Sequence, residues 1–153
     1  IHAAGSGVGS MAIQIAKMIG ARVIVTAGSD WKLEKARDLG ADEGVNYITT
    51  PNFSRRVLEL TEGKGVDMIF DVVGAAVWDE SLLSLGRGGR LVNSGNTSGA
   101  QVSLDINRLR ERPLHLMGSG GRGRRSFVDM MRAVWHGHLK GIIGRTFALE
   151  DVA

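Results

Sequence analysis

The chain has 153 residues, of which 43% are hydrophobic and 23% charged, which indicates one soluble globular domain with a proper core. No apolar run is long enough to cross a bilayer and no cysteine is present, which excludes disulfides and Cys-ligated metals and favours a cytoplasmic protein. The net charge of +3 and one short basic cluster (Arg122, Arg124 and Arg125), without interleaved aromatic residues, argue against nucleic acid as a partner.

Short apolar segments alternate with segments of helical periodicity along the whole chain. In chain order, the predicted strands are Ile1–Ala3, Val23–Thr26, Val45–Ile48, Val66–Val73, Arg90–Ser94 and Pro113–Gly118. The predicted helices are Val8–Ile19, Leu33–Leu39, Pro51–Leu60, Trp78–Leu85 and Phe127–His136. This alternation, with short glycine-marked connections, predicts a single α/β domain with a doubly wound parallel sheet of six strands, a Rossmann fold.

Several boundaries are predicted from capping and turn residues. Ser29 is placed to cap the second helix, and Thr50 and Pro51 are placed at the N-cap and first position of the third. The segment GRGGR, residues 86–90, predicts a turn before the fifth strand. Because the sequence begins inside a predicted strand and stops where a helix begins at Glu150, we expect a piece of a longer protein, truncated at both ends.

The connection after the first strand is rich in glycine. It contains G-x-G-x-x-S from Gly5 to Ser10 and, in the other register, A-x-S-x-x-G from Ala4 to Gly9. Both supply the small residues that a pyrophosphate needs in front of a helix N-terminus. The spacing G-x-G-x-G also occurs in S-adenosylmethionine-dependent methyltransferases, so the turn alone leaves a dinucleotide and a methyl donor open.

The end of the second strand favours a dinucleotide that carries an extra phosphate. Ala27 and Gly28 occupy the position where an acidic residue would hold ribose hydroxyls, and Asp30 falls in the first turn of the next helix. Ser29 and Lys32 follow, and a hydroxyl, an ammonium and a helix N-terminus together suit the 2′-phosphate of NADP(H). The alternative is that Ser29 is only a cap and Lys32 a solvated residue.

Five segments together resemble the medium-chain dehydrogenase/reductase superfamily: HAAGSGVGSMAIQIAKMIGARVI, GSDWKLEKARDLGAD, GVDMIFDVVG, LSLGRGGRLVNSGNTSG and TFALEDVA. The resemblance spans essentially residues 1–153 but covers only the family's nucleotide-binding domain, so it implies a longer two-domain oxidoreductase. AAVWDESLLSLGRGGRLV and RPLHLMGS are most similar to zinc-type alcohol dehydrogenases, and zinc-free quinone oxidoreductases are the alternative. Any zinc would be bound by the catalytic domain, which this sequence does not contain.

The resemblance also implies a cofactor, its binding residues and an assembly. The cofactor is NADP(H), the substrate a small carbonyl, alcohol or quinone, and the assembly a homodimer paired through the sixth strand at Leu114–Met117. The implied binding residues are Ser6, Gly7, Val8 and Gly9 at the pyrophosphate, Ser29, Lys32 and Tyr47 at the 2′-phosphate, and Val73, Gly74, Ser94, Gly95, Asn96, Gly118 and Ser119 beside the nicotinamide and the sixth strand. No catalytic residue is expected in this chain, and Tyr47 could alternatively be a packing residue.

Other polar residues are interpreted as structural. His2 is expected to be packed and hydrogen-bonded, with a role on the substrate side as the alternative. Asp67 and Asp71 flank a buried strand and are interpreted as strand-end polar groups, and no metal site is predicted. A methyltransferase domain and a non-catalytic NADPH-sensing module remain the rival functions.

Overall fold

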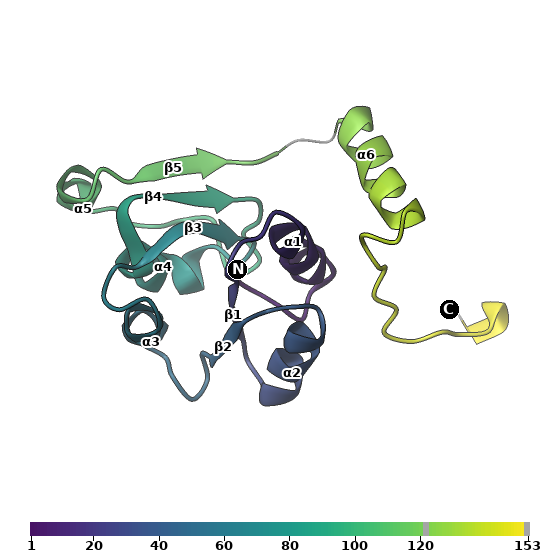
Figure 1. Ribbon diagram of the computed structural model, residues 1–153. Helices are drawn as coiled ribbons and strands as arrows, with labels where there is room; N and C mark the ends of the chain where they lie inside the picture. The colour runs from purple at the N-terminus through teal and green to yellow at the C-terminus, as the bar shows by residue number, and fades with distance from the viewer. Residues whose placement is uncertain (121–122, 152–153) are drawn as a thin grey trace.

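The computed structural model describes residues 1–120 and 123–151 and contains alternating helices and strands (Figure 1). Arg122 of the predicted basic cluster lies outside the described residues. In chain order the elements are α1 (Gly7–Met18), β1 (Ile24–Ala27), α2 (Asp30–Asp38), β2 (Glu43–Asn46), α3 (Phe53–Leu60), β3 (Val66–Asp71), the 3-10 helix η1 (Ala75–Val77), α4 (Trp78–Ser84), β4 (Leu85–Asn93), α5 (Ile106–Glu111), β5 (His115–Gly118), α6 (Arg124–Trp135) and the 3-10 helix η2 (Leu149–Asp151).

The strands are parallel and form two sheets, β1–β2 and β3–β4–β5. The predicted parallel α/β architecture is confirmed, but a continuous six-stranded sheet is not. The first predicted strand, Ile1–Ala3, is not a strand because Ala3 has a φ of 52°, outside the extended region.

The segment at residues 1–4 nevertheless connects the two sheets through its backbone. On one side the N–H of Thr26 donates to the carbonyl oxygen of Ile1 (3.0 Å), and on the other the N–H of His2 donates to Phe70 (3.1 Å). The segment therefore lies between β1 and β3. Because this segment leads into α1, the carboxyl ends of β1 and β2 lie on one side of the N-terminus of α1, and those of β3, β4 and β5 lie on the other side.

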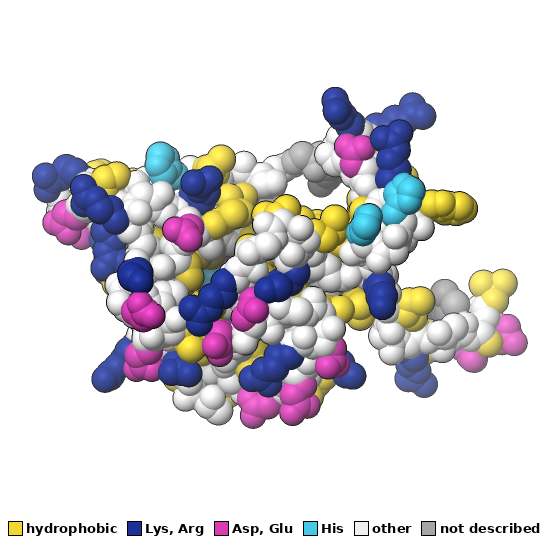
Figure 2. All heavy atoms as spheres, viewed as in Figure 1, with side chains coloured by type: hydrophobic (Ala, Val, Ile, Leu, Met, Phe, Trp, Pro, Cys, Tyr) yellow, Lys and Arg dark blue, Asp and Glu magenta, His cyan; other side chains and the backbone are white. Residues whose placement is uncertain are grey.

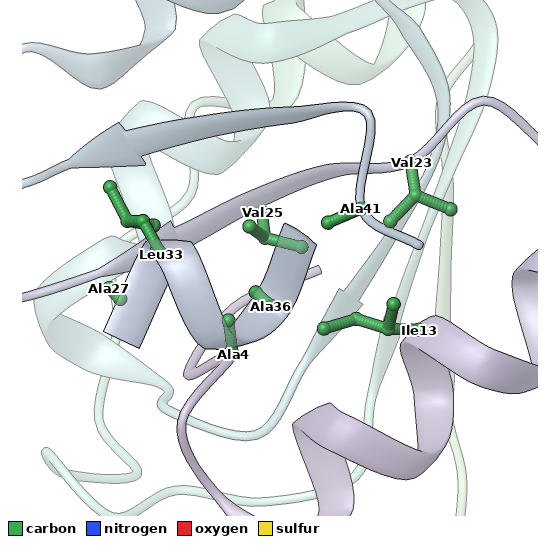
Figure 3. Packing of buried hydrophobic residues seen from close by; sticks show 8 residues of the cluster. All are labelled: Ala4, Ile13, Val23, Val25, Ala27, Leu33, Ala36 and Ala41. Atoms are coloured by element: carbon green, nitrogen blue, oxygen red, sulfur yellow. The ribbon is translucent and has the colours of Figure 1, made fainter. Parts of the chain in front are cut away.

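The helices cover both faces of the strands. Val25 and Ala27 of β1 face Ile13 of α1 and Leu33 and Ala36 of α2, and these residues belong to the cluster in Figure 3. Because successive strand side chains point to opposite faces, Ile24 lies on the other face, in the cluster built on α3. A third cluster joins α4 to β3 and β4 through Ile69, Leu82, Leu85 and Leu91.

The third helix begins later than predicted. It starts at Phe53 with Asn52 as N-cap, so Thr50 and Pro51 are not its cap and first residue. The Thr50 N–H instead closes a turn after β2 by donating to the carbonyl oxygen of Asn46 (2.8 Å). The N–H of Ser54 donates to Glu80 Oε2 (2.9 Å), so a side chain from α4 supplies the cap that α3 lacks locally.

The predicted turn at residues 86–90 lies inside β4. The pairing with β3 jumps from Val66–Leu85 to Met68–Arg90, so the intervening residues bulge out of the strand. Gly88 has a φ of +73° in this bulge, a conformation that favours glycine. The glycines therefore mark a strand irregularity rather than the start of the strand.

Helix α6 stands apart from the strands in Figure 1, and the backbone of Lys140, which follows it, is tied to α1. The side chain of Gln14 donates to the Lys140 carbonyl oxygen (3.1 Å) and accepts from its N–H (2.8 Å). In Figure 2, basic side chains gather over α5 and α6 and elsewhere on that face are interspersed with acidic ones. No helix within residues 1–120 or 123–151 has the length and apolar character needed to cross a membrane.

Candidate functional site

The glycine turn leads directly into α1. Ser6 is the N-cap, and its hydroxyl accepts a hydrogen bond from the N–H of Gly9 (2.9 Å). A Cβ at Gly9 would overlap the carbonyl oxygen of Ala3, whereas one at Gly7 would meet no atom within 4 Å. Gly9 is therefore required for packing α1 against the preceding segment, and Gly7 leaves open space in front of the helix.

The N-terminus of α1 presents free donors. In the described part of the chain, no group accepts a hydrogen bond from the N–H of Gly7 or Val8. Unsatisfied N–H groups and the helix dipole make such a terminus a binding site for an anion such as a pyrophosphate. The side chain of Val8 is 54% exposed and points away from the core.

The end of β1 carries no acidic side chain toward this turn. Ala27 is buried, and the Asp30 carboxylate accepts a hydrogen bond from the Asn46 side chain (2.8 Å). The residue type that would repel a 2′-phosphate is thus absent from the strand end. This arrangement agrees with the interpretation of the sequence around Ala27.

Ser29 precedes α2, but its side chain makes no capping hydrogen bond, contrary to the prediction. The N–H groups of Lys32 and Leu33 donate instead to its backbone carbonyl oxygen (3.2 and 3.3 Å). The Ser29 hydroxyl is consequently buried without a hydrogen-bond partner in the described structure. A buried polar group left unsatisfied costs about 1–3 kcal/mol, so the end of β1 carries a hydroxyl whose hydrogen-bonding capacity is uncompensated.

Lys32 extends from α2 to the glycine turn. Its aliphatic chain passes so close to Gly5 that a Cβ there would lie 2.9 Å from Lys32 Cδ. Its ammonium lies 5.4 Å from the ring centroid of Trp31. Lys32 thereby brings a positive charge between the end of β1 and the N-terminus of α1.

Tyr47 follows β2 and reaches the same place. Its N–H donates to the carbonyl oxygen of Ala27 (3.1 Å), and its hydroxyl would lie 2.8 Å from a Cβ at Gly28. The structure therefore places Tyr47 against Gly28, next in the chain to Ser29, and the aliphatic chain of Lys32 against Gly5 of the glycine turn. Gly5 and Gly28, which make room for the lysine and tyrosine side chains, were not among the predicted site residues.

A cavity of about 640 Å³ lies on the other side, at the ends of β4 and β5. Of the predicted residues, its lining includes Gly74, Ser94, Gly95, Asn96, Gly118 and Ser119. Val73 does not line it: its carbonyl oxygen accepts hydrogen bonds from the N–H (2.8 Å) and hydroxyl (2.7 Å) of Ser98. The residues predicted for the pyrophosphate and 2′-phosphate also lie outside this cavity.

Part of the cavity wall is formed by the connections after β3 and β4, which approach each other at two glycines. Gly74 has a φ of 88°, and a Cβ there would lie 2.5 Å from the carbonyl oxygen of Gly99. A Cβ at Gly95 would lie 2.8 Å from the carbonyl oxygen of Val72. The glycines thus let the connections after β3 and β4 approach each other closely.

Asp71, the last residue of β3, is fully buried beneath this wall. Its Oδ1 accepts hydrogen bonds from the N–H groups of Val73 (2.7 Å) and Gly74 (3.1 Å). Its Oδ2 accepts one from Asn93 Nδ2 (2.9 Å), which also donates to the carbonyl oxygen of Gly95 (2.8 Å). Sequence analysis assigned Asp71 only to a strand end and did not single out Asn93.

His2 is buried and hydrogen-bonded at both ring nitrogens, which confirms the prediction for this residue. Nδ1 lies 2.8 Å from the Thr26 hydroxyl and Nε2 lies 2.8 Å from the Ser81 hydroxyl. Because Ser81 donates its proton to the carbonyl oxygen of Val77 (2.5 Å), Nε2 is the donor and Nδ1 the acceptor. Burial lowers the pKa of His2 to about 3, so the ring is neutral.

The site's chemistry is that of binding and orientation. Across the residues whose structure is described, no three His, Cys, Asp or Glu side chains are grouped closely enough to hold a metal ion. The arrangement offers free N–H donors, an ammonium and two hydroxyls on one side, and a glycine-walled cavity on the other.

Comparison with known proteins places this arrangement in a family. The sequence profile described as "Zinc-binding dehydrogenase" matches residues 7–136. The chain is 40% identical over 111 residues to a quinone oxidoreductase of Salmonella typhimurium, covering 72% of this chain and 34% of that protein. It is 32% identical over 153 residues to an NAD-dependent alcohol dehydrogenase of Sulfolobus acidocaldarius, covering 99% and 43%.

Solved structures show the same relationship. A quinone oxidoreductase of Escherichia coli complexed with NADPH aligns with a TM-score of 0.83 and 31% identity, over 94% of this chain and 46% of that one. An NAD-dependent alcohol dehydrogenase aligns with a TM-score of 0.87 and 43% identity, over 94% and 41%. The chain thus spans less than half the length of these relatives. It belongs to the zinc-binding dehydrogenase family of the medium-chain dehydrogenase/reductase superfamily of oxidoreductases, and it corresponds to their nucleotide-binding domain.

Proposed function

We propose that this chain is the NADP(H)-binding domain of an oxidoreductase that transfers hydride between the nicotinamide and a carbonyl or alcohol. The observation that carries the cofactor assignment is the end of β1, which has no acidic side chain and is followed by Ser29, whose hydroxyl has no hydrogen-bond partner among the described residues. The side chains of Lys32 and Tyr47 pack against Gly5 and Gly28 on either side of this strand end. The similarity to an oxidoreductase structure complexed with NADPH supports the assignment.

Three groups of described residues bind three parts of the cofactor. The N–H groups of Gly7 and Val8 bind the pyrophosphate, and Ser29, Lys32 and Tyr47 bind the 2′-phosphate. With the adenosine on the β1–β2 side of α1, the nicotinamide half extends to the cavity lined by Gly74 and Gly95. The bound cofactor supplies the hydride, and the chain's residues hold and orient it.

A zinc-free reduction of a quinone or an activated alkene is the second candidate. It is favoured by the quinone oxidoreductases at about 40% identity and by a 2-haloacrylate reductase of Burkholderia at 31% identity over the whole chain. The similar alcohol dehydrogenases favour a carbonyl or alcohol. A second domain that completes the enzyme would carry the groups, zinc included, that decide between them.

We also propose that two copies pair through the outer edge of β5. In the described ranges β5 has one neighbouring strand, β4, and Met117 is 53% exposed. Sedimentation analysis of the chain and of a Met117→Lys variant tests this. A dimer lost in the variant is expected, and a monomeric parent chain would contradict it.

The proposed function is tested by titrating the purified chain with NADPH, NADH and S-adenosylmethionine. We expect NADPH to bind at least tenfold more tightly than NADH, and S-adenosylmethionine not to bind. Equal affinity for NADH would overturn the 2′-phosphate site, and binding of the methyl donor alone would favour a methyltransferase. We expect no turnover, so steady NADPH oxidation with aldehydes or quinones would show catalytic groups within the chain.

A further inference from the structure

Two polar residues at the cavity are not explained by the hydrophobic core: Asp71, which is buried beneath the wall, and Asn93, which lines the cavity. Asp71 is 0% exposed, and within the described residues its carboxylate accepts hydrogen bonds from the N–H groups of Val73 and Gly74 and from the side chain of Asn93, the last residue of β4. A carboxylate taken out of water is costly unless such donors replace its hydration. Here the donors come from the segments that form the cavity wall.

The pair connects three strand ends at one point. Asp71 holds the connection after β3 through Val73 and Gly74, and Asn93 holds the connection after β4 through Gly95. The backbone carbonyl oxygen of Asn93 accepts from the N–H of Ser119 (2.8 Å), which follows β5. Gly74, Gly95 and Ser119 all line the cavity. The two side chains thus hold two parts of the cavity wall, and the backbone of Asn93 holds the third.

Within residues 1–120 and 123–151, neither side chain of the pair makes a hydrogen bond to the other half of the site. The pair's side-chain partners all lie within residues 71–95, whereas the phosphate-binding residues lie in 6–9 and 29–47. A change in this pair is therefore transmitted to the cavity wall and not to the adenosine side.

We infer that Asp71 and Asn93 are positioning residues for the nicotinamide half of the cofactor, an inference that rests on the proposed function. They fix the glycine wall so that the flat ring is held against Gly74 and Gly95, and neither residue touches the reacting atoms. Bonds from buried carboxylate to backbone N–H are strong and directional, which suits this role.

Asp71→Asn changes the hydrogen bonds of this pair in a specific way. The new amide can accept at only one of its two ends, so its Nδ2 faces either the N–H groups of Val73 and Gly74 or the side-chain amide of Asn93. If Asn93 rotates to accept from that amide, it can no longer donate to Gly95. Asn93→Ala also removes the hydrogen bond to Gly95. Because Asn93 is only half-buried, this substitution disturbs the fold less than Asp71→Asn does.

The test compares two ligands that share the adenosine 2′-phosphate half: NADPH and adenosine 2′,5′-bisphosphate. Both Asp71→Asn and Asn93→Ala are expected to lower the affinity for NADPH about tenfold, the equivalent of one lost hydrogen bond. Their affinity for the bisphosphate should change less than twofold. The increase in nicotinamide fluorescence on binding should shrink in both variants. Asp67→Asn, the same substitution at an exposed site on β3, should change nothing.

Loss of affinity for both ligands alike, or for neither, would overturn the inference. Unfolding of the Asn93→Ala chain would overturn it too, because the pair would then be needed for the fold itself. A parent chain that binds neither ligand contradicts the proposed function instead, so the two failures are distinguishable.

Discussion

The hydroxyl of Tyr47 lies directly over Gly28, close enough that a Cβ on Gly28 would stand 2.8 Å from it. The strand end therefore has glycine where a side chain would displace the tyrosine. This contact places the phenol at the end of β1, next in the chain to Ser29, whose hydroxyl has no hydrogen-bond partner among the described residues.

Gly28→Ala should displace the Tyr47 ring and weaken NADPH binding about three- to tenfold, because the new methyl group takes the space of the phenol. NADH binding should change by less than twofold. Gly44→Ala is the matched control, since the three atoms nearest to a Cβ there all belong to the side chain of Leu33, away from Tyr47. Isothermal titration calorimetry measures both, and equal losses for NADPH and NADH would refute the assignment of Tyr47 to the 2′-phosphate.

Lys32→Ala removes the only charged group assigned to that phosphate. We expect NADPH affinity to fall by about 1.5–3 kcal/mol, the value of a hydrogen bond to a charged group, and NADH affinity to stay nearly unchanged. Lys35→Ala, on the same helix with a largely exposed side chain, is the control. If both lysines have the same effect, general surface charge and not a specific contact attracts the cofactor.

Gly9 and Gly7 should respond differently to alanine. Gly9→Ala forces a Cβ into the carbonyl oxygen of Ala3, so we expect a loss of about 1–3 kcal/mol in the free energy of unfolding. Gly7→Ala meets no atom of the chain and should keep the stability but weaken both NADPH and NADH, because the methyl group occupies the space in front of α1. Urea unfolding and cofactor titration separate the two, and a stable Gly9→Ala chain would contradict the close packing.

His2 makes stability depend on pH in a defined direction. Its pKa is lowered by burial to about 3 in the folded chain, against about 6.5 when unfolded, so between these values the unfolded chain binds more protons. The free energy of unfolding should therefore fall as pH drops below about 6.5, by up to about 1.4 kcal/mol per pH unit from this group. Urea unfolding at pH 7 and pH 5 measures it.

The non-titrating His2→Gln variant is the control for that measurement. This variant should be less stable at neutral pH, because the hydrogen bonds to Thr26 and Ser81 are disturbed. Its free energy of unfolding should, however, fall less between pH 7 and pH 5 than that of the parent chain. An unchanged slope would assign the pH dependence to other groups.

Much of the fold could be predicted from local sequence. Most strands are short apolar runs, and most helices end at residues whose backbone conformation stops a helix. Gly20 and Gly40 follow α1 and α2 with positive φ, as a helix end requires. The start of α3 could not be derived locally, because its cap comes from Glu80, 26 residues away in the chain. α5 was not predicted either, although Asp105 caps it by accepting from Asn107.

In the site, too, some residues could be predicted from the neighbouring sequence and others only from contacts between distant segments. Ser29 and Lys32 are predicted as site residues from their place after a strand end without an acid, and Tyr47 from the resemblance to the family; their binding of a 2′-phosphate stays a prediction. Asp71 and Asn93 could not be predicted, since the role of each depends on the pairing of β3 with β4, which places them opposite each other. The sequence predicts Ser29 as a cap, and Ser29 does occupy the N-cap position of α2, but its hydroxyl makes no hydrogen bond within the part of the chain that the structure describes.

The most direct test of the account compares adenosine 2′,5′-bisphosphate with 5′-AMP, two ligands that differ only in the 2′-phosphate. Calorimetric titration of the chain should show the bisphosphate binding at least tenfold more tightly, with most of that preference lost in Lys32→Ala. Equal affinities for the two ligands would contradict the 2′-phosphate site and, with it, the assignment of NADP(H) as the cofactor.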